Sequence, residues 1–216
     1  MIRQLFQNRN LVFILCLAVF MVSCRQSSEK QLPVYNPSDF NQTLVDKSLS
    51  KTSKDHRISD FNLINQNGKK VTQDDYKDKI YVTDFFFTSC TSICPIMTGN
   101  MVKVQEAFLN NNDIMFLSLS VTPDIDSIPK LREYATQKGV IDSKWNVTTG
   151  EKKHIYNLAR KSYFAVVDQG DGGLQDFIHT PNFILIDKKK RIRGVYDGTD
   201  NNEIRRLIYD INILIN

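Results

Sequence analysis

Apolar runs separated by helix-period stretches define the expected secondary structure of the chain. Three runs dense in β-branched and aromatic residues predict strands covered on both faces: KIYVTDFFF (79–87), DIMFLSLSV (113–121) and NFILID (182–187). A hairpin is predicted over residues 61–72, because the Asn-Gly pair in FNLINQNGKKVT supplies the positive backbone angles of a tight turn. RIRGVYDG (191–198) follows the last run closely enough to be its hairpin partner.

Four stretches carry apolar residues at helical intervals, and they cover residues 95–110, 124–140, 148–163 and 201–215. Strands that alternate with helices predict an α/β sandwich, and we expect a central mixed, largely parallel sheet flanked by helices, with an N-terminal β-hairpin. This order of elements resembles a thioredoxin-like fold.

The first 23 residues predict an export signal. Two arginines and no acid precede an unbroken apolar run over residues 11–22, which is shorter than the about 20 residues of a membrane span. Ser23 followed by Cys24 has the shape of a bacterial lipoprotein cleavage site, so Cys24 is expected to become the lipidated first residue. The alternative is an ordinary signal peptide in which Cys24 is incidental.

The rest of the chain divides by composition into a tether and one domain. Residues 24–52 are polar and poorly periodic, which predicts a lipid-anchored flexible leash, and residues 53–216 have the size of a single thioredoxin-like domain. The net charge of +4 falls to +2 once the signal with its two arginines is removed. That charge does not indicate a nucleic-acid-binding surface.

Two of the four cysteines remain as thiols in the exported chain, since Cys16 leaves with the signal and another is lipidated. Cys90 and Cys94 could form a structural disulfide, a redox couple or a metal clamp. Pro95 places Cys94 beside a helix start, where free amides and the helix dipole favour a thiolate, so a lowered pKa is expected for Cys94. The three-residue spacing favours a metal clamp without forbidding a disulfide, whereas a structural bridge closing so short a loop would contribute little.

Three histidines are available as further ligands. His179 precedes the strand at 182–187, whose start lies beside the first helix in a thioredoxin-like arrangement, so it is expected to face the thiols. His56 and His154 are expected to be solvent-facing and structural or incidental. Two thiolates and one imidazole suit Cu(I), and Cu(II) with one further ligand. Structural zinc is disfavoured because it requires four ligands.

Two residues point instead to thiol-disulfide chemistry. Asp84 stands in an otherwise apolar strand, and if buried beneath the thiols it would have a raised pKa and could accept a proton during disulfide exchange. An Asp84 that faces water is the alternative. Thr180-Pro181 could be a cis peptide, or Pro181 could be a plain strand-opening proline.

Three segments of the chain together resemble the Sco/SenC family: FFFTSCTSICPIM, SLSVTPDIDSIPKLREYA and DFIHTPNFILID. The resemblance runs from about His56 to the C-terminus and implies a thioredoxin-like, copper-binding protein that assists cytochrome c oxidase assembly. Carried over, Cys90, Cys94 and His179 are the copper ligands. The family's loop after the second parallel strand is matched by a segment that holds two aspartates, expected to be structural or docking positions: Asp124 and Asp126.

The sequence departs from the family at Thr91, where proline is frequent, and at Ile178, where many members have aspartate. Asp84 and Pro181 look more like the buried aspartate and cis-proline of thioredoxins. A reductase role for the same cysteine pair therefore stays open, including one that keeps the oxidase's copper-site cysteines reduced.

These observations predict a copper chaperone rather than an enzyme. It is expected to be exported, anchored by lipid to the bacterial membrane with its domain on the periplasmic or extracytoplasmic side, and to use copper as Cu(I) and also as Cu(II). The expected partners are the copper-site subunit of cytochrome c oxidase and a thiol reductant of the same compartment. A membrane-anchored thiol-disulfide oxidoreductase is the alternative. A thiol peroxidase ranks third, because the motif supplies no activating arginine.

Overall fold

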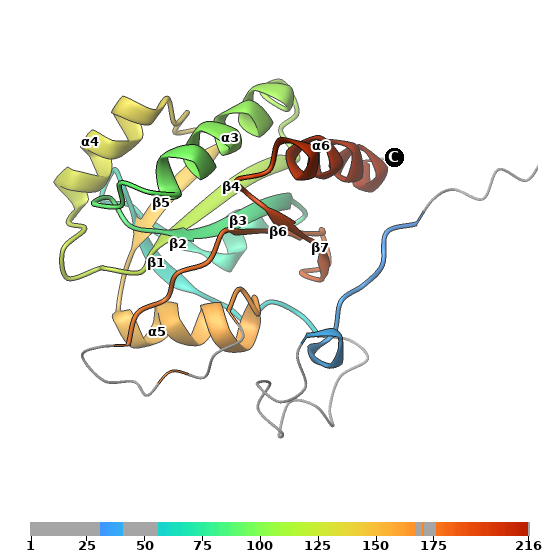
Figure 1. Cartoon of the computed structure of the whole chain (residues 1–216), viewed down its shortest axis with the longest axis horizontal. Helices are drawn as coiled ribbons and strands as arrows, with labels where there is room; N and C mark the ends of the chain where they lie inside the picture. Colours follow the sequence, from blue (N-terminus) through green and yellow to red (C-terminus); the bar gives the residue numbers. More distant parts are fainter. Residues whose placement is uncertain (1–30, 41–55, 167–169, 171–175, 216) are drawn as a thin grey trace, which may run out of the picture. The chain divides into compact units, whose positions relative to one another are not determined.

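A computed structural model describes residues 31–40, 56–166, 170 and 176–215. The chain divides into two compact units, Met1–Gln31 and Leu32–Asn216, and nearly all described residues belong to the second (Figure 1). In the described part, no helix combines the length and the apolar character needed to cross a membrane.

A seven-stranded sheet runs through the centre of the second unit, in the order β2-β1-β5-β4-β3-β6-β7. The strands are β1 (Asn62–Asn65), β2 (Lys70–Thr72), β3 (Ile80–Phe86), β4 (Ile114–Ser120), β5 (Trp145–Thr149), β6 (Asn182–Ile186) and β7 (Ile192–Asp197). β4 pairs in parallel with β3 and β5, and the other four pairings are antiparallel. The mixed sheet is confirmed, but the expectation that it is largely parallel is wrong, because the hairpins β1-β2 and β6-β7 extend both of its sides.

Helices cover both faces of the sheet. They are α3 (Cys94–Ala107), α4 (Ile128–Lys138), α5 (Lys152–Asn157), which continues as a π-helical turn (Leu158–Ser162), and α6 (Asn201–Ile215); two short 3-10 helices are Pro37–Asp39 and Gln73–Tyr76. Figure 1 shows α3, α4 and α6 on one face and α5 on the other. The α/β thioredoxin-like fold is therefore confirmed, together with its N-terminal hairpin.

Local sequence explains most element boundaries. Pro95 occupies the first turn of α3, where its missing amide costs nothing. α4 ends at Gly139, whose φ of 77° lies in the left-handed region that glycine adopts easily. β5 was not predicted, because its five residues include three that are polar. Two of them, Asn146 and Thr148, are buried and hydrogen-bonded, as when the Thr148 hydroxyl donates to the Ser118 carbonyl at 2.8 Å.

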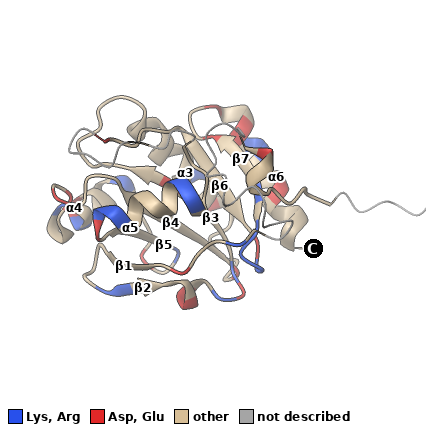
Figure 2. Ribbon diagram, turned by 90° about the horizontal axis from the view of Figure 1, so that it is seen from below, with Lys and Arg blue, Asp and Glu red and all other residues tan. Residues whose placement is uncertain are grey.

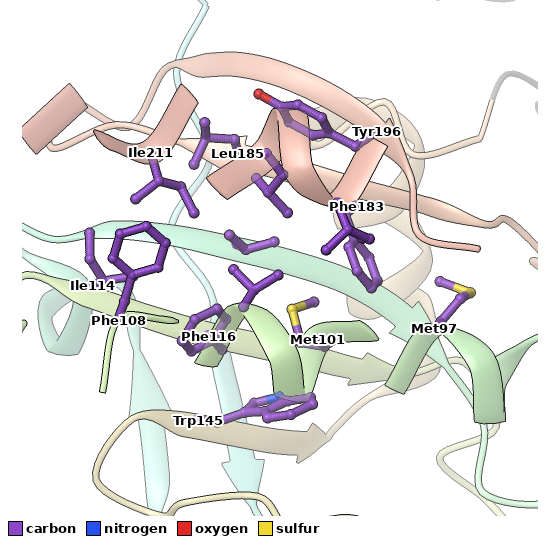
Figure 3. Close-up of a cluster of buried hydrophobic side chains, with 14 of the residues drawn as sticks. Met97, Met101, Phe108, Ile114, Phe116, Trp145, Phe183, Leu185, Tyr196 and Ile211 are labelled. Atoms are coloured by element: carbon purple, nitrogen blue, oxygen red, sulfur yellow. The ribbon is translucent and has the colours of Figure 1, made fainter. Parts of the chain in front are cut away.

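Two hydrophobic clusters lie on opposite faces of the sheet. Figure 3 shows the cluster beneath α3, where Met101 lies beside Phe116 and Trp145, and Met97 lies on the side of Phe183. Side chains alternate along β3, so Ile80, Val82 and Phe86 enter this cluster while Tyr81 and Phe85 enter the opposite one. By the same alternation Asp84 lies on the α3 face.

Residues 32–40, which we call the strap, pack on the domain although they were expected to belong to a free leash. The amide of Tyr35 donates to the Ile192 carbonyl at 2.9 Å, and Arg193 Nε donates to the Pro33 carbonyl at 2.9 Å. The Phe40 ring lies 5.0 Å from that of Phe164. The strap thereby covers the edge strand β7, which would otherwise present unpaired backbone groups.

His56 is buried, which corrects the expectation that it faces solvent. Its Nε2 donates to the Ser162 carbonyl at 2.7 Å, and its ring lies 4.7 Å from that of Phe164. Burial lowers the pKa of His56, although the bond to Ser162 opposes the change. The structural role expected for His56 is confirmed.

Acidic and basic residues are interspersed over the elements that Figure 2 displays. Several form surface pairs, such as Arg132 Nη1 with Asp142 Oδ2 at 2.8 Å. Such exposed pairs contribute little to stability.

Candidate functional site

The two thiols lie where β3 leads into α3. Cys90 is in the connecting turn, residues 87–93, which we call the thiol turn, and its amide donates to the Phe87 carbonyl at 3.2 Å. Cys94 is the first residue of α3 and is buried, with 4% of its surface exposed, whereas Cys90 is half-buried. Both are free thiols. The strand-to-helix turn therefore presents one accessible sulfur above one enclosed sulfur.

The sequence predicts a lowered pKa for Cys94, but in the structure it is Cys90 whose pKa is lowered. The amide of Cys94 donates to Cys90 Sγ at 3.4 Å. Partial burial opposes the thiolate of Cys90, but hydrogen bonds from the Cys94 thiol and from amides of Cys94, Ser92 and Ile93 outweigh it, so the pKa of Cys90 lies below its ordinary value. The free amides at the start of α3 donate hydrogen bonds to the Cys90 sulfur, which lies in front of them.

Cys94 has the less acidic thiol. Burial raises its pKa to about 12, and the hydrogen bond with Cys90 and the nearby charge of Asp84 act in the same direction. The expected lowered pKa of Cys94 is wrong because this side chain turns into the cluster beneath α3. Cys90 therefore has the more acidic thiol of the pair.

Asp84 is buried, with 2% of its surface exposed, so the buried interpretation holds and the solvent-facing one is wrong. Burial raises the pKa of Asp84 to about 7, against the opposing effect of Ser118, whose hydroxyl donates to it at 2.5 Å. Trp145 Nε1 in turn donates to that hydroxyl at 2.9 Å. A buried carboxyl with a raised pKa thus lies under α3, close enough for its charge to act on Cys94.

His179 is exposed and lies beside two aromatic rings. Its ring centroid is 6.4 Å from that of Phe87 and 6.4 Å from that of Phe177, which it stacks on. Within the described ranges, no three His, Cys, Asp or Glu side chains lie close enough together to hold a metal ion. The structure thus brings Cys90 and Cys94 together and places His179 beside Phe87, the residue with which the thiol turn begins.

The segment that follows His179 opens β6. No described peptide bond is cis, so Thr180-Pro181 is trans and Pro181 is a plain strand-opening residue. The Thr180 hydroxyl and Asn182 Nδ2 both donate to the Ala165 carbonyl, at 2.9 and 3.0 Å. The comparison with the cis-proline of thioredoxins therefore fails at this position.

The remaining candidate residues fall into three places. Asp124 lines a surface cavity together with Lys152 and Phe177. Asp126 is fully buried. His154 is half-buried, and its Nε2 accepts a hydrogen bond from the amide of Asn62 at 3.3 Å. Cys24, the expected lipidation site, lies outside the described residues.

Phe87 and Phe177 were not identified from the sequence as part of the site. Their rings meet edge to face, with centroids 5.1 Å apart. Since the Phe87 carbonyl accepts the Cys90 amide and its ring contacts His179, Phe87 connects the thiol turn with the histidine. Its position at the end of an aromatic run gave no sign of this role.

An α/β domain of thioredoxin-like fold, with a Cys-x-x-x-Cys-Pro pair at the first parallel strand-to-helix turn, defines the class of this protein. A sequence model of the SCO1/SenC family matches residues 50–215. The chain belongs to the SCO1/SenC family.

Solved structures agree with this assignment. The crystal structure of a SCO1/SenC family lipoprotein from Bacillus anthracis is 32% identical, covers 77% of this chain and 99% of its own, and superposes with a TM-score of 0.66. BsSco, described as a member of the Sco family of cytochrome c oxidase assembly proteins with a disulfide switch, is 29% identical over 75% of this chain and 95% of its own, with a TM-score of 0.63. Arabidopsis thaliana ScoI with copper bound shares the fold at 23% identity, over 72% of this chain and 98% of its own, with a TM-score of 0.58.

Proposed function

We propose that this protein is a copper chaperone that holds the ion through Cys90, Cys94 and His179 and delivers it to the dinuclear copper site of cytochrome c oxidase. The observation that carries the proposal is the adjacent pair of free thiols at the start of α3, one of them accessible. Membership of the SCO1/SenC family supports it. BsSco, 29% identical, belongs to a family of oxidase assembly proteins.

The donor set fits copper better than other metals. The Cys90 and Cys94 side chains are adjacent, since they hydrogen-bond to each other and the Cys94 amide reaches Cys90 Sγ. Soft thiolate donors of this kind favour Cu(I). Structural zinc would need four ligands. His179 can complete a three-donor site only if its side chain turns toward the thiols, because its ring lies against the rings of Phe87 and Phe177.

The difference in exposure between the two sulfurs suits delivery. Half-buried Cys90 is the sulfur that an incoming ligand from a partner protein would meet, while enclosed Cys94 keeps its hold on the ion. A three-coordinate ion can accept the incoming ligand before it releases an old one. In this scheme copper is the cargo, and a thiol reductant of the same compartment keeps the pair reduced between deliveries.

The proposed location follows from the N-terminal pattern. Residues 1–23 are the export signal, Cys24 carries the lipid, and the domain stands on the extracytoplasmic side of the membrane. A Bacillus anthracis relative that is 32% identical is a lipoprotein, which supports this proposal. Labelling with a radioactive fatty acid, compared between the parent and Cys24→Ser, tests it: the label is expected in the parent alone, and equal labelling would overturn it.

A titration tests copper binding. The purified, reduced protein is titrated anaerobically with Cu(I) against a competing chelator, beside Cys90→Ser, Cys94→Ser and the matched surface control Thr91→Ser. We expect one tightly bound ion in the parent and the control, and affinity lower by at least about 100-fold in either cysteine variant. Equal affinity in all four proteins would reject the proposal.

A thiol-disulfide oxidoreductase is the second candidate, and buried Asp84 is the observation that favours it. A carboxyl with a pKa of about 7 below the thiol pair can take a proton from Cys94 as that sulfur attacks a mixed disulfide. In that reaction Cys90 first attacks the substrate disulfide and forms a mixed disulfide with one substrate sulfur. Cys94 then attacks the Cys90 sulfur and releases the substrate, so the products are the protein disulfide and the reduced substrate dithiol. Reduction of a model disulfide that needs Asp84 and is indifferent to His179→Ala would favour this candidate.

A further inference from the structure

Asp126 is a fully buried carboxylate in the loop between β4 and α4. It accepts four hydrogen bonds: from the Thr88 hydroxyl at 2.5 Å, the Thr88 amide at 3.2 Å, the Ser120 hydroxyl at 2.6 Å and the Thr122 hydroxyl at 3.0 Å. We call these four residues the Asp126 clamp. Among the described residues no ion pair involves Asp126, so hydroxyls and an amide satisfy this buried charge.

The clamp joins two segments that are far apart in sequence. Ser120 ends β4 and Thr122 follows it, whereas Thr88 stands 38 residues before Asp126, in the turn that carries Cys90. Two of the four bonds go to Thr88, one from its amide and one from its side chain. Loss of a partner from a buried charged group is costly, so the position of Thr88 is strongly restrained.

Thr88 lies in the thiol turn between Phe87, which contacts His179, and Cys90, the accessible thiol. Phe87 before it accepts the Cys90 amide with its carbonyl and contacts His179 with its ring. Cys90 after it accepts the Cys94 amide on its sulfur at 3.4 Å. A restraint on Thr88 therefore reaches both the sulfur and the aromatic contact with the histidine.

We propose that Asp126 is a positioning residue that, through Thr88, holds the thiol turn in the geometry in which it binds its cargo. The inference rests on the proposed copper site for its functional consequence. Groups behind the ligands commonly change metal affinity by about 10- to 100-fold without touching the ion. Asp126 acts in this way because it fixes the backbone of the turn and not the sulfur itself.

Two substitutions at Thr88 separate the hydrogen bond from the packing of the side chain. Thr88→Val keeps the shape and removes the hydroxyl, whereas Thr88→Ser keeps the hydroxyl and removes a methyl group. We expect Thr88→Val to weaken Cu(I) binding about 10-fold and Thr88→Ser to bind as the parent does. Thr136→Val is the matched control, since its hydroxyl donates to the Arg132 carbonyl on α4 and touches neither thiol.

A second measurement does not depend on copper. Amide hydrogen exchange at Cys90, followed by NMR in the metal-free reduced protein, reports how firmly the turn is held. Thr88→Val and Asp126→Ala are expected to exchange this amide about 10-fold faster than the parent, and Thr88→Ser and Asp126→Asn to stay close to it. In Asp126→Asn the side-chain oxygen can still accept from the Thr88 amide, while the Thr88 hydroxyl turns to accept from the new NH₂ group. Urea unfolding of each variant identifies any that fail to fold.

The outcomes distinguish this inference from the proposed function. Faster exchange and weaker binding in Thr88→Val, both rescued in Thr88→Ser, support the clamp. Exchange and binding unchanged in Thr88→Val, or altered equally in Thr88→Ser, overturn it. If the parent binds no Cu(I), the copper proposal fails, and the exchange measurement alone still decides whether Asp126 holds the turn.

Discussion

The thiol turn and the His179 side chain meet at Phe87, but they are held in different ways. The turn is fixed by hydrogen bonds, including those from Thr88 to buried Asp126 and from the Cys94 amide to Cys90 Sγ. His179 is exposed and lies against aromatic rings. Ring contacts permit sliding and rotation that directed hydrogen bonds do not. One half of the proposed site is thus preformed, and the other half can adapt.

This difference suits a protein that must both capture and release an ion. In the proposed site, a preformed pair of sulfurs would need little reorganisation to bind, and His179 as third ligand would leave as a partner's ligand arrives. Four experiments test the difference between the two halves, in order of decreasing expected effect.

The largest effect concerns the two sulfurs of the thiol turn. Cys90 is half-buried with a lowered pKa, while burial raises the pKa of Cys94 to about 12. Since the thiolate is the reactive form, iodoacetamide at neutral pH is expected to modify Cys90 at least about 1,000-fold faster than Cys94. Mass mapping of the modified peptides measures the ratio. Equal rates, or a faster Cys94, would contradict the assignment of the accessible sulfur.

Asp84→Asn is expected to change how stability depends on pH. Because burial raises the pKa of Asp84 to about 7, the folded protein keeps this proton after the unfolded chain, with an ordinary pKa of 3.8, has released it. Stability from this group is therefore fully present below pH 3.8 and is lost as pH rises to about 7. The variant should lack this loss and be more stable than the parent at pH 8 by as much as about 4 kcal/mol.

Urea unfolding from pH 4 to pH 8 measures the effect, with exposed Asp74→Asn as control. The profile of the control is expected to follow the parent. An unchanged slope in Asp84→Asn would show that folding does not raise the pKa of this carboxyl.

His179→Ala tests the half of the proposed site that can adapt, which is the His179 side chain. The side chain is exposed, so its removal should leave the free energy of unfolding within about 0.5 kcal/mol of the parent. Loss of a third ligand is expected to weaken Cu(I) binding about 10-fold. Competition titration against a chelator measures this change, and His154→Ala provides a control histidine away from the thiols. Binding unchanged in His179→Ala would remove this residue from the site.

Phe40→Ala gives the smallest expected effect and asks whether the strap supports the His179 segment. Phe40, Phe164 and His179 line one cavity, and the ring pair of the first two is worth about 1 kcal/mol of stability. Thermal unfolding should show that loss. Cu(I) affinity is expected to change by less than about twofold, and a change as large as that of His179→Ala would mean that the strap fixes the histidine.

Elements with strong local patterns were predictable from sequence. The Asn-Gly hairpin, the three apolar strands and the helix opened by Pro95 all carry periodic or turn signals that tertiary contacts do not override. β5 gave no such signal, because its polar residues are buried only through partners on β1 and β4. The docking of the strap was not predicted for a related reason: residues 24–52 are polar and irregular as a whole, whereas residues 32–40 within them contact partners near Ile192, distant in the chain.

The chemistry of the site was predictable in its residues but not in its geometry. The cysteine pair is predictable from its spacing, its place before the helix start at Pro95 and the family resemblance, and Asp84 from a charge in an apolar strand. Which sulfur is the acidic one depends on the direction of the helix amides, and the separation of His179 from the thiols depends on the placement of Phe87 and Phe177. Neither the direction of the helix amides nor the distance between His179 and the thiols can be deduced from a local sequence pattern.

In the proposed copper site, two fixed sulfurs capture Cu(I) and the His179 side chain turns to join them. X-ray absorption spectroscopy of the Cu(I)-loaded protein counts sulfur and nitrogen neighbours of the ion directly, in the parent and in His179→Ala. We expect two sulfurs and one nitrogen in the parent, and two sulfurs without the nitrogen in the variant. A parent spectrum that lacks either sulfur, or that is identical to the variant's, would contradict it.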